Sequence, residues 1–159
     1  MSYTQDQMIA MFNQLQQSLI DRSKRNCITV SPSSESAITS KTPFRLPCPT
    51  VKHSVGSQLT IQAGEVRIGA GITSVKASAN ILVVGAQIVD PIYVYIRKNE
   101  NINVAISLIS VSTTGWNTIS VAPTLFSVNE GDLISVWIRN ELAGRGTIYA
   151  DSTFTVEAL

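Results

Sequence analysis

The chain has 159 residues, a net charge of +1 and 14% charged residues, whereas an average soluble domain has about 25%. This length suits one domain with a small appendage, and so small a net charge would not attract nucleic acid or an anionic membrane. The first residues lack a basic region followed by an apolar run, so no secretory signal is expected, and the longest nearly uncharged apolar stretch, residues 79–89, is about half as long as a membrane helix.

Residues 1–25 are predicted to form a helix that needs a partner. Thr4 and Gln7 have the spacing of a capping box, and basic residues gather at the other end, where cations favour the helix dipole. Apolar residues recur with the a/d rhythm of a coiled coil at Met8, Phe12, Leu15 and Leu19. Because an isolated helix of this length is marginal in water, we expect a stem of three or more helices or docking onto another protein. Packing back onto its own domain is the alternative.

Residues 26–55 are predicted to be an extended linker. The segment is rich in Ser and Thr and contains four prolines, which forbid a long helix and favour edge-like backbone. We expect one or two short strands here, with a path along the next subunit as one option. The two cysteines, Cys27 and Cys48, have neither CxxC spacing nor a histidine partner, so reduced, partly buried thiols are favoured over a disulfide.

Residues 56–159 are predicted to form a series of consecutive β-strands. Period-two alternation dominates, as in 92–99, where Ile and Val alternate with Tyr and Arg, and Gly, Asn and Asp punctuate the strands. No helical period appears, which argues against a parallel sheet with crossover helices. We expect an antiparallel sandwich of about eight to ten strands, most simply a jelly roll. Its final strand would run to the C-terminus and pair on both sides in the middle of a sheet.

Groups that could converge for catalysis are scarce. The single histidine, His53, has no evident partner, and the acidic residues are scattered without a calcium-loop pattern. The run 69–71 lacks the third glycine of a dinucleotide loop, and no serine stands in a nucleophile signature. We therefore expect no enzyme, no catalytic residue, no cofactor and no metal site.

Several strands carry bulky residues on both faces. Trp137 points away from the Ile and Val side of its strand, and so do Tyr93 and Tyr95 in theirs. Aromatic residues on a second face suit a subunit interface, where Tyr and Trp are enriched. A carbohydrate-stacking surface would suit the same pattern. We expect Tyr93, Tyr95 and Trp137 at a subunit interface and regard Trp116 as a candidate ligand contact.

The order of motifs resembles the tumour-necrosis-factor-like and complement-globular-head superfamily, above all its bacteriophage branch of small virion proteins. The resemblance spans about residues 56–159 and rests on GEVRIG at 64–69, the long strand at 74–85 and IYVYIRKN at 92–99. The family's xxGDxIxVxV unit is matched by Gly131, Asp132, Ile134, Val136 and Ile138. Phe154 stands where the family places an aromatic in its last strand. The ending TFTVEAL departs from that of the animal proteins, so no animal-type receptor site or calcium ligand carries over.

This resemblance implies a TNF-like, all-β antiparallel jelly-roll head, preceded by one α-helix, that forms a compact homotrimer with Phe154 at the interface. The implied function is a non-enzymatic phage structural protein, a capsid decoration or head fibre, displayed on virions assembled in the host cytoplasm. The helix would bind a capsid or tail protein. A tail or baseplate receptor-binding protein, or a lectin that contacts a host surface glycan, is the alternative, and a bacterial trimeric signalling or spore-surface protein is a third option. No nucleic acid or membrane partner is expected.

Overall fold

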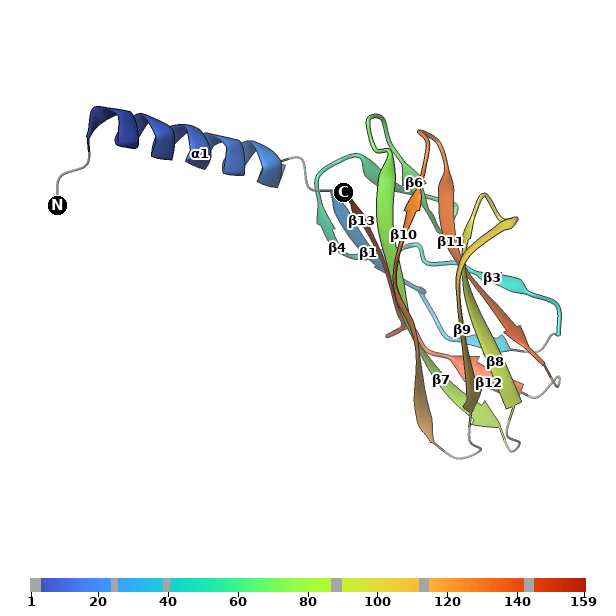
Figure 1. Ribbon diagram of the computed structural model, residues 1–159. Helices are drawn as coiled ribbons and strands as arrows, with labels where there is room; N and C mark the ends of the chain where they lie inside the picture. The colour runs from blue at the N-terminus through green and yellow to red at the C-terminus, as the bar shows by residue number, and fades with distance from the viewer. Residues whose placement is uncertain (1–3, 24–25, 39–40, 87–89, 112–114, 142–144) are drawn as a thin grey trace.

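The protein consists of one helix followed by a two-layered β-sandwich (Figure 1). The computed structural model describes residues 4–23, 26–38, 41–86, 90–111, 115–141 and 145–159. Within these ranges it contains one α-helix and thirteen strands, and all strand pairs are antiparallel. No helix in the described part of the chain is long and apolar enough to cross a membrane.

Helix α1 (Gln5–Ser23) begins with the predicted capping box. The Thr4 N–H donates to Gln7 Oε1 at 3.0 Å, and the Gln7 N–H donates to Thr4 Oγ1 at 3.3 Å, so two backbone donors of the first turn are satisfied. The described side chains, at 4–17, are all exposed, and the helix extends away from the sandwich (Figure 1). The alternative of a helix packed on its own domain is therefore not what this part of the chain adopts.

The first sheet, sheet A, is organised around the long strand β7. Strand order is β2-β12-β7-β13-β1-β4, and β10 also pairs with β7. Because β7 is long, β12 and β13 can pair with different parts of it, at Val83–Ala86 and at Val75–Asn80. The strands of sheet A are β1 (Cys27–Ser31), β2 (Ser36–Ile38), β4 (Thr50–Val55), β7 (Ser74–Ala86), β10 (Trp116–Ser127), β12 (Arg145–Ile148) and β13 (Thr153–Ala158).

The second sheet, sheet B, has the order β5-β6-β11-β8-β9, and β3 also pairs with β11. β11 pairs with β6 at its start and with β3 further along, so these two short strands follow each other along one edge of β11. The strands of sheet B are β3 (Phe44–Leu46), β5 (Leu59–Gln62), β6 (Glu65–Ile68), β8 (Asp90–Lys98), β9 (Ile102–Val111) and β11 (Leu133–Asn140).

The core lies between the two sheets and consists mainly of Ile and Val. Each strand contributes its alternate residues, as the period-two pattern predicts. In β13, Phe154 and Val156 are buried, whereas Thr153 and Thr155 on the opposite face are partly exposed. Removal of these apolar side chains from water is the main force that holds the sheets together.

The prediction of a linker at 26–55 is wrong. β1 pairs with both β13 and β4, and its residues Ile28 and Val30 are buried in the core. The segment adds four short strands to the sandwich, which is why the strand number exceeds the eight to ten expected. Its prolines lie outside the strands, so they interrupt the chain without breaking a strand pair.

The last strand lies where it was expected. β13 pairs with β7 on one side and with β1 on the other. The chain end is held as well, because the Ala158 N–H donates to the Asn26 carbonyl at 2.8 Å and the Leu159 N–H donates to the Ser74 carbonyl at 3.2 Å. The C-terminus therefore lies beside the start of β1, at the end of the sandwich from which α1 leaves (Figure 1).

Candidate functional site

The outer face of sheet B carries a layer of aromatic and arginine side chains. Trp137 pairs with Tyr95 in the strand register, and Tyr93 stacks on Tyr95 with 6.1 Å between ring centroids. The Arg97 guanidinium carbon lies 4.6 Å from the Trp137 ring centroid and 5.3 Å from that of Tyr95. Arg139 covers Tyr93 at 4.7 Å. These are cation–π distances, so the chain's own arginines cover the aromatic rings.

Hydrogen bonds hold this layer in place. Arg97 donates from Nε to Asn103 Oδ1 at 2.7 Å and from Nη1 to the Glu100 carbonyl at 3.3 Å. The Trp137 indole N–H donates to Ser135 Oγ at 3.0 Å. Arg97 and the Trp137 indole N–H are thus paired within the chain, whereas Arg139 Nε is buried without a hydrogen-bond partner.

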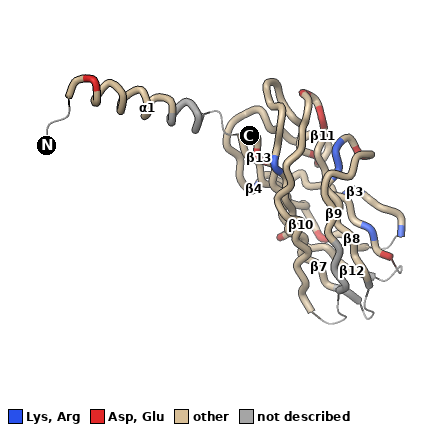
Figure 2. The backbone as a smooth tube through the Cα atoms, in the orientation of Figure 1, with Lys and Arg blue, Asp and Glu red and all other residues tan. Residues whose placement is uncertain are grey.

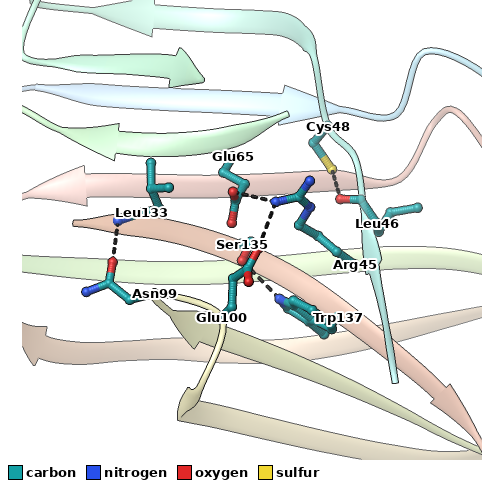
Figure 3. Close-up of polar contacts among 9 residues, drawn as sticks. All are labelled: Arg45, Leu46, Cys48, Glu65, Asn99, Glu100, Leu133, Ser135 and Trp137. Atoms are coloured by element: carbon teal, nitrogen blue, oxygen red, sulfur yellow. Dashed lines mark hydrogen bonds and ion pairs between the residues drawn. The ribbon is translucent and has the colours of Figure 1, made fainter. Parts of the chain in front are cut away.

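An acidic residue is buried at the junction of β6 and β3. Glu65 is 3% exposed, and its Oε2 accepts a hydrogen bond from Arg45 Nη1 at 2.5 Å. The same guanidinium nitrogen lies 3.2 Å from Glu100 Oε1, and Figure 3 shows Arg45 reaching both carboxylates. Gly64, with a φ of +79°, lets the chain pass close to Pro47, since an added Cβ would lie 3.1 Å from the Pro47 Cα. This close approach brings β3 near Glu65.

The predicted GD turn is a hydrogen-bonded corner. Asp132 accepts from the Asn129 N–H at 2.9 Å and from the Asn99 amide at 2.7 Å, and Asn99 Oδ1 accepts from the Leu133 N–H at 2.9 Å. Burial alone would raise the pKa of Asp132, but these hydrogen bonds and the nearby Lys98 ammonium outweigh it and lower the pKa. The carboxylate therefore adds stability above its unfolded-state pKa of about 3.9 and loses it as the pH falls through the folded value. The geometry is that of a structural turn.

The outer face of sheet A, which we call the sheet A face, differs in composition from the outer face of sheet B. Residues that pair across neighbouring strands share a face, and here these pairs are mostly small and polar, such as Thr155 with Ser78 and Thr153 with Asn80. The ion pair between Lys76 and Glu157, at 2.7 Å, is internal to the face. Figure 2 shows long stretches without charged residues along β7 and β10.

Large apolar side chains on the sheet A face are exposed. Trp116 and Leu125 are each 63% exposed, and Val55 is 43% exposed. The Trp116 ring contacts Tyr149, with 4.2 Å between ring centroids and planes inclined by 51°. A charge-poor face with exposed apolar residues has the composition of a protein–protein contact. We take the sheet A face as the candidate functional site.

Three of the residues predicted for a subunit interface lie on the outer face of the other sheet, and their place at an interface stays a prediction. Tyr93, Tyr95 and Trp137 are on the outer face of sheet B, under their own arginines. The prediction for Phe154 is wrong, because this side chain is 1% exposed and points between the sheets, where the alternation of β13 directs it. It belongs to the core of a single chain and has no surface to offer a neighbour.

The other predicted residues are exposed. Trp116 lies on the sheet A face, and Met8, Phe12 and Leu15 on α1 are 54%, 60% and 60% exposed. Leu19 lies within α1, but its side chain is outside the described part of the structure. Sequence reasoning missed the small polar residues of the sheet A face. The available signal was the alternation of Thr with core residues in the last strand, TFTVEA.

Known structures with a similar fold include murine APRIL at pH 5.0, Eiger TNF from S. frugiperda and the PRD1 vertex protein P5. The TM-scores are 0.64, 0.59 and 0.58, at 14%, 12% and 16% sequence identity. The matches cover 86%, 85% and 85% of this chain and 100%, 91% and 96% of the other chains. The chain has a TNF-like jelly-roll fold. No protein-family model and no curated protein sequence matches it.

At these identities, the similarity defines the fold alone. The TNF-like sandwich, with its single N-terminal helix, agrees with the fold class expected from the sequence. Among the described residues, no group of three His, Cys, Asp or Glu side chains is arranged to hold a metal ion.

Proposed function

We propose that this chain is a non-enzymatic, trimeric structural protein of a bacteriophage virion, a capsid decoration or head fibre, whose subunits meet through the sheet A face. The observation that carries this proposal is the exposure of Trp116 and Leu125 on a charge-poor face of a TNF-like sandwich. A homotrimer is what the resemblance to TNF-like proteins implies. Residues 1–25 would attach the trimer to a capsid or tail protein, and assembly would take place in the host cytoplasm.

The chemistry of the sheet A face supports close packing of copies. Small residues such as Ser78 and Thr155 allow two sheets to approach, and burial of exposed apolar area contributes about 25 cal/mol per Å². The Lys76–Glu157 pair is neutralised within each chain, so like charges do not oppose the contact. The scarcity of charged residues also fits a surface that is largely buried in the assembly.

The virion role is supported by a protein of the same fold. The PRD1 vertex protein P5 matches 85% of this chain and 96% of its own length. A TNF-like head is thus compatible with a place on a virus particle. Helix α1, which extends away from the sandwich (Figure 1), provides a segment that could join the head to the rest of a particle.

A charge placed on each face tests the proposed contact. Thr118, on the sheet A face, and Thr60, on sheet B, are both exposed strand threonines. The unchanged protein should have a mass of about 52 kDa by light scattering, three times 17.2 kDa. Thr118→Glu should raise the dissociation constant of the trimer by more than about tenfold, because it buries an unpaired carboxylate in each subunit contact. The matched control Thr60→Glu should remain trimeric. A monomeric unchanged protein, or equal association of both variants, would overturn the proposed contact.

Particle association tests the virion role. The chain should be present in particles purified from infected cells, and removal of residues 1–25 should abolish its incorporation. A truncated head that still joins particles would contradict attachment through this segment. A particle free of the chain would contradict the virion role itself.

Carbohydrate binding is a second candidate, and the Trp116–Tyr149 pair favours it. An exposed indole held at 4.2 Å by a second ring is a surface on which a sugar can stack. The protein would then be a tail or baseplate receptor-binding protein or a lectin for a host surface glycan. Binding to a glycan array that disappears in Trp116→Ala, together with quenching of Trp116 fluorescence in the assembled protein, would favour this function over the subunit contact.

A further inference from the structure

We propose that the apolar stripe of α1 is covered by the α1 helices of two further copies, which form a parallel three-helix stem on the axis of the head trimer. This inference rests on the proposed trimer and deepens it, because it assigns the helix surface to self-association. Contact with a particle is then left to the outer, polar surface of the stem.

The stripe has the width of a helix that faces two neighbours. Met8, Phe12 and Leu15 occupy successive d, a and d positions and are 54%, 60% and 60% exposed in the single chain. Ile9 and Met11 lie beside them at e and g and are 52% and 48% exposed. In a two-stranded coiled coil the e and g positions border water and are commonly charged. Apolar residues at these positions fit a bundle in which each helix contacts two others.

The charge distribution of α1 favours identical partners. Asp6 is the only charged residue among positions 4–17, and the polar positions are mostly Gln. Such a helix offers no charge pattern by which a foreign partner would be selected. Three copies in parallel would also meet little like-charge repulsion along positions 4–17, and the charged residues Asp21 and Arg22 lie in the last turn of the helix.

The helix leaves the head from the proposed subunit contact. α1 ends at Ser23 and β1 begins at Cys27, so four residue steps, or at most about 14 Å of chain, separate them. Cys27 pairs with Glu157 and with Val55 and lies in the same row of the sheet A face as the Lys76–Glu157 ion pair. Figure 1 shows that α1 leaves the sandwich at the end where the C-terminus lies. If three heads meet through the sheet A face, their helices therefore start near one axis and at the same end. The stem is therefore parallel and in register.

Tethering explains why so short a stripe is sufficient. A helix of 19 residues is marginal in water by itself. Joined to a trimeric head, each helix meets the other two at an effective concentration in the range of about millimolar, as short linkers provide. Association of the heads has then already brought the helices together, so the helices lose little further translational entropy when they pack.

Cysteine pairing in the full-length chain tests the stem. Leu15→Cys places a thiol in the stripe, and Asn13→Cys places one on the polar side of the same helix, both in a Cys27→Ser background. Cys48 is 1% exposed, and burial raises the pKa of its thiol to about 12, so it does not interfere. On mild oxidation at micromolar protein, Leu15→Cys should form covalent dimers at least about tenfold faster than Asn13→Cys, while light scattering reports a trimer for both.

Each other outcome has a separate meaning. A trimer in which Leu15→Cys pairs no faster than Asn13→Cys would overturn the stem and leave the head trimer standing. Monomers of both variants and of the unchanged protein would overturn the proposed trimer. If Leu15→Cys pairs only with a capsid or tail protein in particles and not within free trimers, the stripe is a docking site and the stem is wrong.

Discussion

The two outer faces of the sandwich show that bulk alone does not identify a contact surface. Sheet B carries Tyr93, Tyr95 and Trp137 on its outer face, yet arginines of the same chain cover these rings. The sheet A face is made mostly of small polar residues, and there Trp116 and Leu125 remain 63% exposed. The two faces differ in whether arginines of the same chain cover the aromatic rings.

Register explains the difference. On sheet B, an arginine and an aromatic residue from neighbouring strands are placed side by side, because Ser135 pairs with Arg97 and Trp137 with Tyr95. On the sheet A face, Trp116 pairs with Val84, and no cation lies on either strand near this pair. The same alternation of buried and exposed positions thus produces one face whose aromatic rings are covered by arginines and one on which an indole is exposed. Sheet B still exposes an aliphatic side chain, because Ile106, which pairs with Tyr95, is 56% exposed.

The largest expected effect comes from the core that both faces share. Phe154→Ala should lower the free energy of unfolding by about 3–5 kcal/mol, because it removes a fully buried aromatic ring. Urea unfolding should show this loss in the assembled protein and also in a dissociated Thr118→Glu background. The neighbouring outward-facing Thr153→Ala serves as control and should change stability little. If Phe154→Ala weakened only association, the ring would belong to a contact and not to the core.

A smaller loss should follow from opening the sheet B face at Arg45. Arg45→Ala leaves the buried Glu65 carboxylate without its cation. The free energy of unfolding should fall by about 1–3 kcal/mol, which is less than for a fully buried pair because Arg45 is 30% exposed. Association should be unchanged. Urea unfolding of Arg45→Ala, Glu65→Gln and the double variant measures the coupling, and strictly additive losses would contradict a working ion pair.

A still smaller effect is expected at Arg97, where the two faces can be compared by fluorescence. Arg97→Ala should lower the free energy of unfolding by about 0.5–2 kcal/mol, because the guanidinium at 4.6 Å from the Trp137 ring is lost. The uncovered Trp137 indole should also become more accessible to quenching by iodide. A Trp116→Phe background leaves Trp137 as the single emitting indole. Arg97→Lys keeps a cation without the planar group and should give an intermediate result. Unchanged quenching in Arg97→Ala would mean that the ring was not covered by this arginine.

The sequence carries the fold in its local patterns. The alternation in β8 and β13, the Gly131–Asp132 turn and the Thr4–Gln7 capping box each depend on residues close in the chain, and the structure contains all of them. The sequence does not reveal that 26–55 belongs to the head. Its strands are only three to six residues long, too short for a clear alternation, and the prolines and serines between them suggest a linker.

The role of each face depends on residues distant in the chain. Alternation shows that a strand has two faces, but it does not say which face another strand or side chain will cover. Trp137 and Arg97 are 40 positions apart and meet only through the β8–β11 register. For the same reason the sequence alone does not place Phe154 in the core, since its depth between the sheets depends on β1 and β7 on either side of β13.

The smallest expected effect is a difference in the rate at which the two cysteine thiols are modified. Cys48 is 1% exposed, and its pKa is raised to about 12 by burial; the pKa of Cys27 is raised by burial and then by the nearby Glu157 carboxylate. Because only thiolates react quickly, Cys48 should stay silent until unfolding. Cys27, on the sheet A face, should be protected in the assembled protein and in Thr60→Glu, but Ellman's reagent should modify it once per chain when Thr118→Glu separates the subunits. Equal rates for Cys27 in the assembled and separated states would show that this row of the face lies outside the contact, and the helix exit would then lie away from the axis.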